Sequence, residues 1–304
     1  MTVHSIALGS LPSSPEQARM WCARLEEGGI LYFPETPVSF PAEDLEFLLS
    51  RRQTGSKLHK NIAYKPGRDR LSGLGRDESG SEEAGRLQAI LRRYSAAVSA
   101  FLAGFLTPYG GRWRLDFASY RPIEEKGRDL PLRRRNDLLH TDAFPTRPTR
   151  GARILRFFNN INPSQTRNWV VGEPFARLLG AFAPGKLALP RAADPLSRAA
   201  RRIACAAGLG ALVPRWKRTP YDEFMMQLHN AMKEDADFQA TCAKEFVEFA
   251  PGSSWMVYTE SVSHAVLSGQ YALEQTFLVD PSVMVIPGSA PVAVLEKMAG
   301  EKLT

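Results

Sequence analysis

Two histidines and an aspartate are the residues of this sequence best suited to carry chemistry. His140 and Asp142 stand one residue apart, and His264 follows 122 residues after Asp142. Side chains alternate between the two faces of a β-strand, so His140 and Asp142 would point the same way. Two imidazoles and one carboxylate on one side of a metal form the facial triad of non-haem Fe(II) oxygenases, which leaves positions open for O2 and a co-substrate. The pattern predicts oxidation chemistry, with His140, Asp142 and His264 as metal ligands and catalytic residues.

A 2-oxo acid co-substrate would need a cation for its far carboxylate. Fe(II) requires two further electrons to activate O2, and decarboxylation of 2-oxoglutarate supplies them in one class of oxygenase. Arginine binds such a carboxylate through two parallel hydrogen bonds. Arg153 and Arg156 stand 13 and 16 residues after His140, on opposite faces of one expected strand. Arg156 is preferred because its face is otherwise apolar, where an unpaired charge is rare. Arg153 is the alternative.

Two polar residues are further candidates for co-substrate contacts. Asn160 shares the expected strand face of Arg156. Gln275 stands eleven residues after His264, where many members of this oxygenase class keep an arginine. The lack of an arginine at that position supports Arg156 as the cation.

The elements that must position these residues change in type along the chain. Apolar residues recur at helical spacing in the first third, and alternating or short apolar runs follow from residue 112. Strands that stop and resume around a helical block indicate an antiparallel β core with an insertion. We expect helices at 14–27, 42–52 and 82–107, an extended stretch at 60–66, and strands at 30–33, 113–120, 138–144, 154–161, 254–258, 263–267 and 272–279.

The composition is that of an ordinary soluble globular chain. The 304 residues are 44% hydrophobic and 23% charged, enough to bury a sizeable core in one large domain. The three cysteines are far apart and form no CxxC pair, which argues against a disulfide framework and a structural zinc site. The N-terminus lacks a secretory signal, and no stretch of 18 apolar residues occurs. We therefore expect a cytoplasmic protein.

Positive charge is concentrated in one segment. Residues 184–218 contain eight basic residues and one acid, Asp194, so their balance of 8 − 1 = +7 equals the net charge of the whole chain. Such a patch suits an anionic partner. Trp216 favours an anionic lipid surface, and the alternative is a solvated helix pair packed by its apolar side. Nucleic acid is not expected, because the aromatic residues are not interleaved with the basic ones.

Several stretches of the chain resemble the Kdo hydroxylase family, and together they cover nearly the whole sequence. The longest is SVSHAVLSGQYALEQTF at 261–277, which contains His264. The others are LHTDAFP at 139–145, RPT at 147–149, RILRFFNNINP at 153–163, VGEPF at 171–175, GGILYFP at 28–34 and KNIAY at 60–64.

The resemblance implies a fold and a domain layout. We expect an α+β protein whose core is a double-stranded β-helix (a jelly-roll), with N-terminal helices and a helical insertion. One dioxygenase domain would span 1–304, with a helical N-terminal part at 1–110, a β core at 111–171 and 251–285, and the insertion at 172–250.

The resemblance also implies an activity. The family uses Fe(II), 2-oxoglutarate and O2, with ascorbate as a supporting reductant, and adds a hydroxyl at C3 of the sugar acid Kdo on Kdo-lipid A, giving Ko. By this resemblance, His140, Asp142 and His264 are the expected iron ligands. The substrate bears carboxylates and phosphates in the cytoplasmic leaflet, so we expect a protein peripheral to the inner membrane, with no protein partner. Expected substrate contacts are Lys60, Tyr64, Arg147 and Arg150, and the run at 133–135 and the basic segment 184–218 are further candidates.

Three other functions stay open at this point. A 2-oxoglutarate dioxygenase could act on another anionic substrate. Two histidines and an aspartate could instead hold zinc around an activated water in a hydrolase, which would need a separate general base and no Arg156. A non-catalytic lipid-surface binding protein could also keep the same fold.

Overall fold

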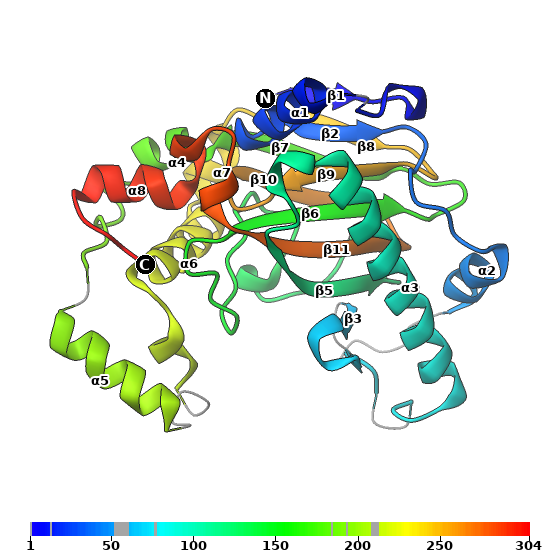
Figure 1. Ribbon diagram of the computed structural model, residues 1–304, viewed down its shortest axis with the longest axis horizontal. Coiled ribbons are helices and arrows are strands. Elements are labelled where there is room, and N and C mark those ends of the chain that lie inside the picture. Colours follow the sequence, from blue (N-terminus) through cyan, green and yellow to red (C-terminus); the bar gives the residue numbers. More distant parts are fainter. Residues whose placement is uncertain are drawn as a thin grey trace.

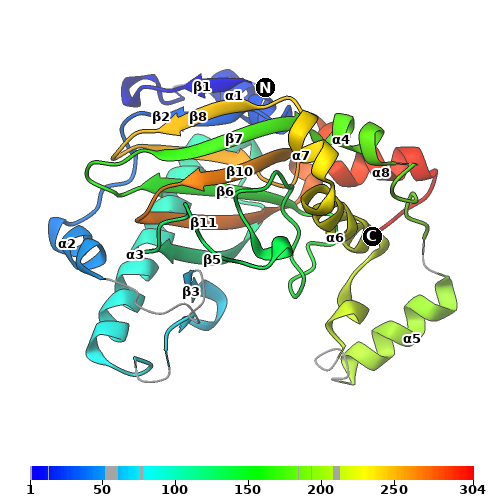
Figure 2. The ribbon, with the colours of Figure 1, turned by 180° about the vertical axis from the view of Figure 1, so that it is seen from behind.

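Two β-sheets pack face to face across an apolar core and form the centre of the molecule (Figures 1 and 2). The computed structural model describes residues 2–12, 14–51, 61–75, 78–183, 185–192, 194–207 and 213–304. The large sheet has the order β1 (Val3–Ser5), β2 (Ile30–Phe33), β9 (Ser254–Tyr258), β6 (Arg153–Asn160), β11 (Ala272–Val279), β5 (Trp113–Arg121), β3 (Ile62–Lys65), β4 (Arg70–Ser72). The small sheet has the order β10 (Val262–Ser268), β7 (Arg167–Pro174), β8 (Glu245–Phe249).

The large sheet is covered on both faces. Every residue of β9 and β11 is buried, as expected for strands with packing on either side. The outer face packs against α1 (Pro15–Glu26) and α3 (Glu82–Phe105), and α3 crosses the sheet in Figure 1. Helix α3 begins where the Ser81 hydroxyl accepts the N–H of Ala84. Helix α2 (Ala42–Ser50) lies beyond the end of this layer.

The inner face of the large sheet meets the small sheet through aromatic side chains. Phe158 and Trp255 from the large sheet pack with Trp169 and Phe249 from the small one. The rings of Phe249 and Trp255 stack with centroids 3.8 Å apart. These contacts set the distance between the two sheets. Two facing sheets are the arrangement expected of the predicted double-stranded β-helix.

A second apolar core holds the helical part together. Its buried residues come from α4 (Phe175–Phe182), α6 (Pro220–Glu234) and the C-terminal α8 (Pro291–Ala299). Helix α6 starts with a capping box in which Thr219 and Asp222 bond reciprocally. Helix α7 (Ala236–Thr241) follows directly. In both views α5 (Pro195–Ala206) stands away from the rest of the molecule.

The predicted α+β architecture is confirmed, but the strand predicted at 138–144 is not a regular strand. His140 makes only an isolated bridge to β10. The reason lies in Gln239 of α7, whose side-chain amide bonds the N–H and the carbonyl oxygen of Leu139, each at 2.9 Å. A side chain therefore satisfies backbone groups that a neighbouring strand would otherwise pair.

Strands also occur in two segments predicted to be helical. Residues 1–110 supply four strands toward the edges of the large sheet in addition to three helices: β2 matches the strand predicted at 30–33, β3 lies in the extended stretch predicted at 60–66, and β1 and β4 were not predicted. Within 172–250, β7 continues to Pro174 and β8 pairs with it. The strands that were not predicted, β1, β4, β7 and β8, are short or alternate in burial, which gives little apolar periodicity in sequence.

Candidate metal centre

The two histidines and the aspartate predicted to bind a metal come together in a buried cluster. Their ligand atoms all lie within 4.8 Å of one another. His264 stands on β10, and His140 is its backbone partner: the His140 N–H donates to the carbonyl oxygen of His264 with an N to O distance of 3.1 Å, and the reverse hydrogen bond measures 2.9 Å. The N–H of Asp142 donates to the carbonyl oxygen of Thr259 at 2.9 Å. Backbone pairing thus brings the three side chains to one point.

Hydrogen bonds orient both imidazoles for metal binding. Nδ1 of His140 lies 2.7 Å from the carbonyl oxygen of Leu138, and Nδ1 of His264 lies 3.2 Å from that of Val262. A carbonyl oxygen only accepts, so each Nδ1 carries the proton and each Nε2 keeps a free lone pair. Oδ2 of Asp142 is buried and has no hydrogen bond to any described residue. Two free Nε2 atoms and a carboxylate oxygen that receives no hydrogen bond, although the Arg156 guanidinium lies beside it, fit a divalent metal ion.

The charges of the cluster also fit a metal. Burial is the main cause that lowers the pKa of His140, and the neighbouring imidazole of His264 lowers it further. Burial likewise lowers the pKa of His264. For Asp142 burial acts to raise the pKa, but the Arg156 guanidinium and the two imidazoles outweigh it and hold the pKa below its usual value. The site therefore offers two neutral imidazoles and one carboxylate.

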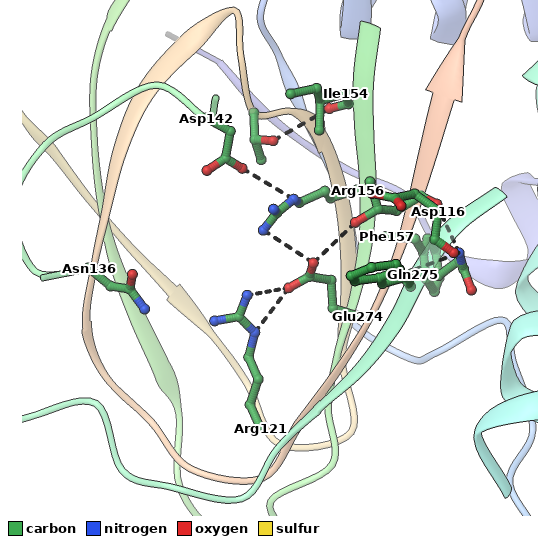
Figure 3. A network of polar contacts seen from close by, with 12 residues as sticks. Asp116, Arg121, Asn136, Asp142, Ile154, Arg156, Phe157, Glu274 and Gln275 are labelled. Atoms are coloured by element: carbon green, nitrogen blue, oxygen red, sulfur yellow. Dashed lines mark hydrogen bonds and ion pairs between the residues drawn. The ribbon is translucent and has the colours of Figure 1, made fainter. Parts of the chain in front are cut away.

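Arg156 connects the cluster to a buried ionic network. Its Nε lies 3.2 Å from Oδ2 of Asp142, and its Nη1 lies 3.2 Å from Oε1 of Glu274 on β11 (Figure 3). Arg121 on β5 also binds Glu274, with Nε to Oε2 at 3.0 Å. Sequence reasoning missed Glu274, although the signal that identified Arg156, a charge within an apolar strand, applies to it equally.

Arg147 lies beside this network between two aromatic rings. The guanidinium carbon stands 3.9 Å from the centroid of Phe117 and 4.2 Å from that of Phe144. Its Nη1 is paired with Asp116. Burial, with Arg156 nearby, lowers the pKa of Arg147 to about 10, so the side chain stays protonated at neutral pH. The Nζ of Lys65 approaches the Phe117 ring at 5.1 Å. A wall of aromatic and cationic groups thus adjoins the cluster.

Helix α6 brings two further residues that the sequence did not single out. His229 Nδ1 lies 2.7 Å from the carbonyl oxygen of Thr141, and its ring meets that of His140 at 5.1 Å. Lys233 stands one turn later and donates to the carbonyl oxygen of Arg133 at 3.2 Å. Burial lowers the pKa of Lys233 to about 8. Their four-residue spacing on a predicted helix was the available signal, but only the fold shows that this face meets the metal cluster.

Two of the predicted co-substrate residues have other partners. Arg153 points to the opposite face of β6 from Arg156, where its Nε lies 2.5 Å from Glu260 and its guanidinium stacks on Tyr258. Asn160 donates to backbone carbonyl oxygens at 249 and 250 and accepts the N–H of Asn162, so it fixes a loop.

Gln275 and most of the predicted substrate residues lie away from the metal cluster or outside the described residues. Gln275 shares its β11 face with residues that pack under α3, so it points away from Glu274. Tyr64 is buried in the same outer core and donates to Asp69 at 2.8 Å. Arg150 is exposed, and Lys60 lies outside the described residues. Among the predicted substrate contacts that the structure describes, Arg147 lies near the metal cluster, beside Arg156 and Phe144.

The comparisons with known proteins agree with this geometry. A family model described as 3-deoxy-D-manno-oct-2-ulosonic acid (Kdo) hydroxylase matches residues 10–302. Among solved structures, the Kdo hydroxylase KdoO, a non-heme Fe(II) α-ketoglutarate-dependent dioxygenase, in complex with α-ketoglutarate and Fe(III), is 32% identical with a TM-score of 0.84, over 100% of this chain and 98% of that one. Its complex with cobalt(II) gives 33% identity and a TM-score of 0.84, over 100% and 97% of the two chains. No curated protein sequence matches.

Proposed function

The chain belongs to the Kdo hydroxylase family, and on this premise we propose that it is an Fe(II)- and 2-oxoglutarate-dependent dioxygenase that hydroxylates Kdo at C3 to give Ko. The observation that carries the proposal is the buried cluster of His140, Asp142 and His264, with both Nε2 atoms free. A relative alike over its whole length was solved with α-ketoglutarate and Fe(III), which supports this combination of metal and co-substrate.

His140, Asp142 and His264 would hold the iron. Bound iron would supply the redox centre at which O2 and 2-oxoglutarate react, so that CO2 is released and one oxygen atom is added to the sugar. The Nδ1–H bonds to the carbonyl oxygens of Leu138 and Val262 keep the imidazoles in the tautomer that binds metal. Packing of Trp169 against His264, with ring centroids 5.2 Å apart, limits rotation of that ring.

Arg156 would bind the far carboxylate of 2-oxoglutarate. It is the arginine beside Asp142, and its side chain is only 13% exposed, so water competes little for a bound carboxylate. The engagement of Arg153 with Glu260 on the other strand face supports Arg156 over the alternative. Glu274, which is itself paired with Arg121, holds the guanidinium in place through Nη1.

Arg147 would bind the carboxylate of the sugar acid. Its pairing with Asp116 and its position between Phe117 and Phe144 fix the guanidinium beside the metal cluster. The half-buried side chain is accessible to a ligand at the edge of this wall. The substrate is then a Kdo-containing glycolipid, and we infer Kdo-lipid A as its form.

Contact with an anionic membrane surface would be made by the basic segment 184–218 through α5. Leu196 and Ile203, seven residues apart and so on one face of α5, are 80% and 71% exposed. The same helix contains Arg198, Arg201 and Arg202 in its sequence, which suits anionic lipid. None of the helices in the described part of the chain is long and apolar enough to cross a bilayer. We infer a peripheral location on the cytoplasmic face of the inner membrane.

The activity is tested with purified protein loaded anaerobically with Fe(II). After addition of 2-oxoglutarate, O2 and Kdo-lipid A, we expect mass spectrometry to show one added oxygen on the sugar. The product should be absent without 2-oxoglutarate and in His140→Ala. The control variant His4→Gln should still form it, because His4 packs against Trp21 rather than in the metal cluster. Consumption of 2-oxoglutarate without an oxygenated lipid would indicate a different substrate. If iron-loaded protein neither consumes 2-oxoglutarate nor oxygenates the lipid, the proposed dioxygenase activity is contradicted.

The membrane contact is tested separately by co-sedimentation with vesicles. Wild-type protein should bind vesicles rich in anionic phospholipid more than zwitterionic ones. The variant Leu196→Asp/Ile203→Asp should lose most of this binding, because it places two charges in the apolar face. Met20→Asp on α1, where the native side chain is 41% exposed, is the matched control and should bind as wild type does. Equal binding of all three proteins would rule out the α5 contact.

A further inference from the structure

A pocket lined by three arginines lies on the large sheet and includes none of the metal ligands. Arg112, Arg114 and Arg150 line it together with Leu278 and Asp280, and its volume is about 420 Å³. We call it the arginine pocket. None of its residues belongs to the metal cluster, and only Arg150 was singled out from the sequence.

Strand register places the arginine pocket next to Arg156, which lies beside the metal cluster. Leu278 pairs with Ile154 on one side and with Arg114 on the other. Thr276, two residues earlier on β11, pairs with Arg156. Residues two apart share a strand face about 7 Å apart, so the row that carries Arg114 follows the row that carries Arg156. Both rows lie on the same face of the large sheet.

The arginine pocket has an excess of positive charge. Arg112 donates to Ser282 at 2.7 Å and lies 3.7 Å from Asp280. No described residue pairs with the guanidinium of Arg114 or Arg150. The three guanidinium cations outnumber the single carboxylate, so the pocket keeps a net positive charge that attracts an anion. The pocket is therefore suited to a group with two negative charges.

The loop that presents Arg150 is held firmly. Arg150 has a backbone φ of +55°, an unfavourable value for a residue with a side chain. The buried Oδ1 of Asp222 accepts the N–H groups of Thr149 and Arg150 at 2.8 and 3.0 Å. The same carboxylate caps α6 through Thr219. The position of Arg150 is thus fixed in the folded protein rather than left to a loose loop.

We propose that the arginine pocket binds a phosphate monoester of the glycolipid substrate while the sugar acid lies at the metal centre. The proposal rests on the proposed function for the identity of the substrate. The pocket itself recognises a phosphate dianion by charge and by guanidinium hydrogen bonds. A free phosphate has the same chemistry, and the two sources are separated by experiment.

The first measurement uses inorganic phosphate as the probe. Cobalt-loaded protein is saturated with 2-oxoglutarate, so that the metal and Arg156 are occupied, and phosphate is titrated by calorimetry. Arg114→Gln/Arg150→Gln should weaken phosphate binding at least tenfold, because charge-assisted hydrogen bonds are lost. Arg19→Gln on α1, also exposed, is the matched control and should leave the affinity unchanged. Equal affinity in the double variant and the wild type would overturn the anion site.

The second measurement compares a phosphorylated Kdo-lipid A with the same glycolipid after removal of its phosphates. Wild-type KM should be lower for the phosphorylated acceptor, and the double variant should raise KM for that acceptor alone, with kcat unchanged. Loss of phosphate binding without any change in KM would overturn the glycolipid as the source and assign a free phosphate. If neither acceptor is hydroxylated, the proposed function fails, while the calorimetric result still decides the arginine pocket.

Discussion

Arg156 sits between two buried carboxylates, and this position decides what its removal does. In Arg156→Met we expect the Kd for 2-oxoglutarate to rise about 10- to 100-fold, because the charge-assisted contact to the far carboxylate is lost. The Kd of Arg156→Lys should lie between those of the wild type and Arg156→Met, since lysine keeps the positive charge but lacks the planar pair of donors. Calorimetric titration of the cobalt-loaded protein measures both. A Kd unchanged in Arg156→Met would assign the carboxylate to another cation.

The same substitution also tests the ionic network. Asp142 and Glu274 each lose a partner in Arg156→Met, so the free energy of unfolding should fall by about 3 to 5 kcal/mol. Co-substrate binding must therefore be measured well below the unfolding temperature of the variant.

Cys22 differs from the other two cysteines in reactivity. Burial raises the pKa of the Cys22 thiol to about 12, so almost no thiolate exists at pH 8. Cys205 and Cys242 are partly exposed. Burial also raises the pKa of Cys242, but its thiol is partly exposed, so we expect a disulfide reagent at pH 8 to modify Cys205 and, more slowly, Cys242 in the folded protein, and Cys22 only after unfolding. Cys22→Ala should leave the number of thiols modified in the folded protein unchanged, and three equal rates would contradict the burial of Cys22.

Single residues differ in how far the sequence could assign them. Residue type and strand parity were enough to predict that His140 and Asp142 lie together and that Arg153 and Arg156 point to opposite faces of β6, as the structure shows. Spacing alone suggested Gln275, and the structure turns that side chain to the outer face. His229 meets the cluster only because α6 packs across it, a contact that no local pattern encodes.

Helix α7 supports the metal centre from outside through Gln239. Gln239→Ala removes the two bonds to Leu139 and a third to the carbonyl oxygen of Met232 at 2.7 Å. The segment that carries His140 should then move more freely, and cobalt(II) affinity should fall about tenfold, as it does when the support of a ligand is removed. Gln227→Ala on the exposed side of α6 should bind cobalt(II) as wild type does. Equal affinities would mean that the His140–His264 bridge alone holds the segment.

The elements with strong apolar patterns were predictable, and those whose pairing depends on distant side chains were not. The helices at α1 and α3 and the strands β9 and β11 lie within a few residues of their predicted bounds. Residues 138–144 carry an alternating pattern that reads as a strand. Their backbone groups are nevertheless shared between α7 and β10, which lie about 100 or more residues further along the chain.

The two ends of the chain are joined through one buried carboxylate. Glu26 at the end of α1 accepts the Tyr109 hydroxyl at 3.0 Å and the N–H groups of Val285 and Ile286 at 2.9 and 2.5 Å. Glu26→Ala leaves these donors without a partner and should lower the free energy of unfolding by about 3 kcal/mol. Urea denaturation measures this loss.

Glu27 provides a control within the same turn of α1. It is exposed, and its carboxylate pairs with Arg24, at 3.5 Å, and with no other described residue. Glu27→Ala should change the free energy of unfolding by less than about 1 kcal/mol. Similar losses in the two variants would contradict a specific role of Glu26 in joining the N-terminal helix to the C-terminal segment.

The backbone bridge between His140 and His264 makes metal binding a measure of correct strand register. A slip of one residue in β10 would turn His264 to the other face of the small sheet, while leaving helix and strand content nearly unchanged. Such a molecule would look folded by circular dichroism and would lack one ligand. The number of metal ions bound per chain at saturation therefore gives the fraction of molecules with the correct register. Metal binding also stabilises these molecules alone.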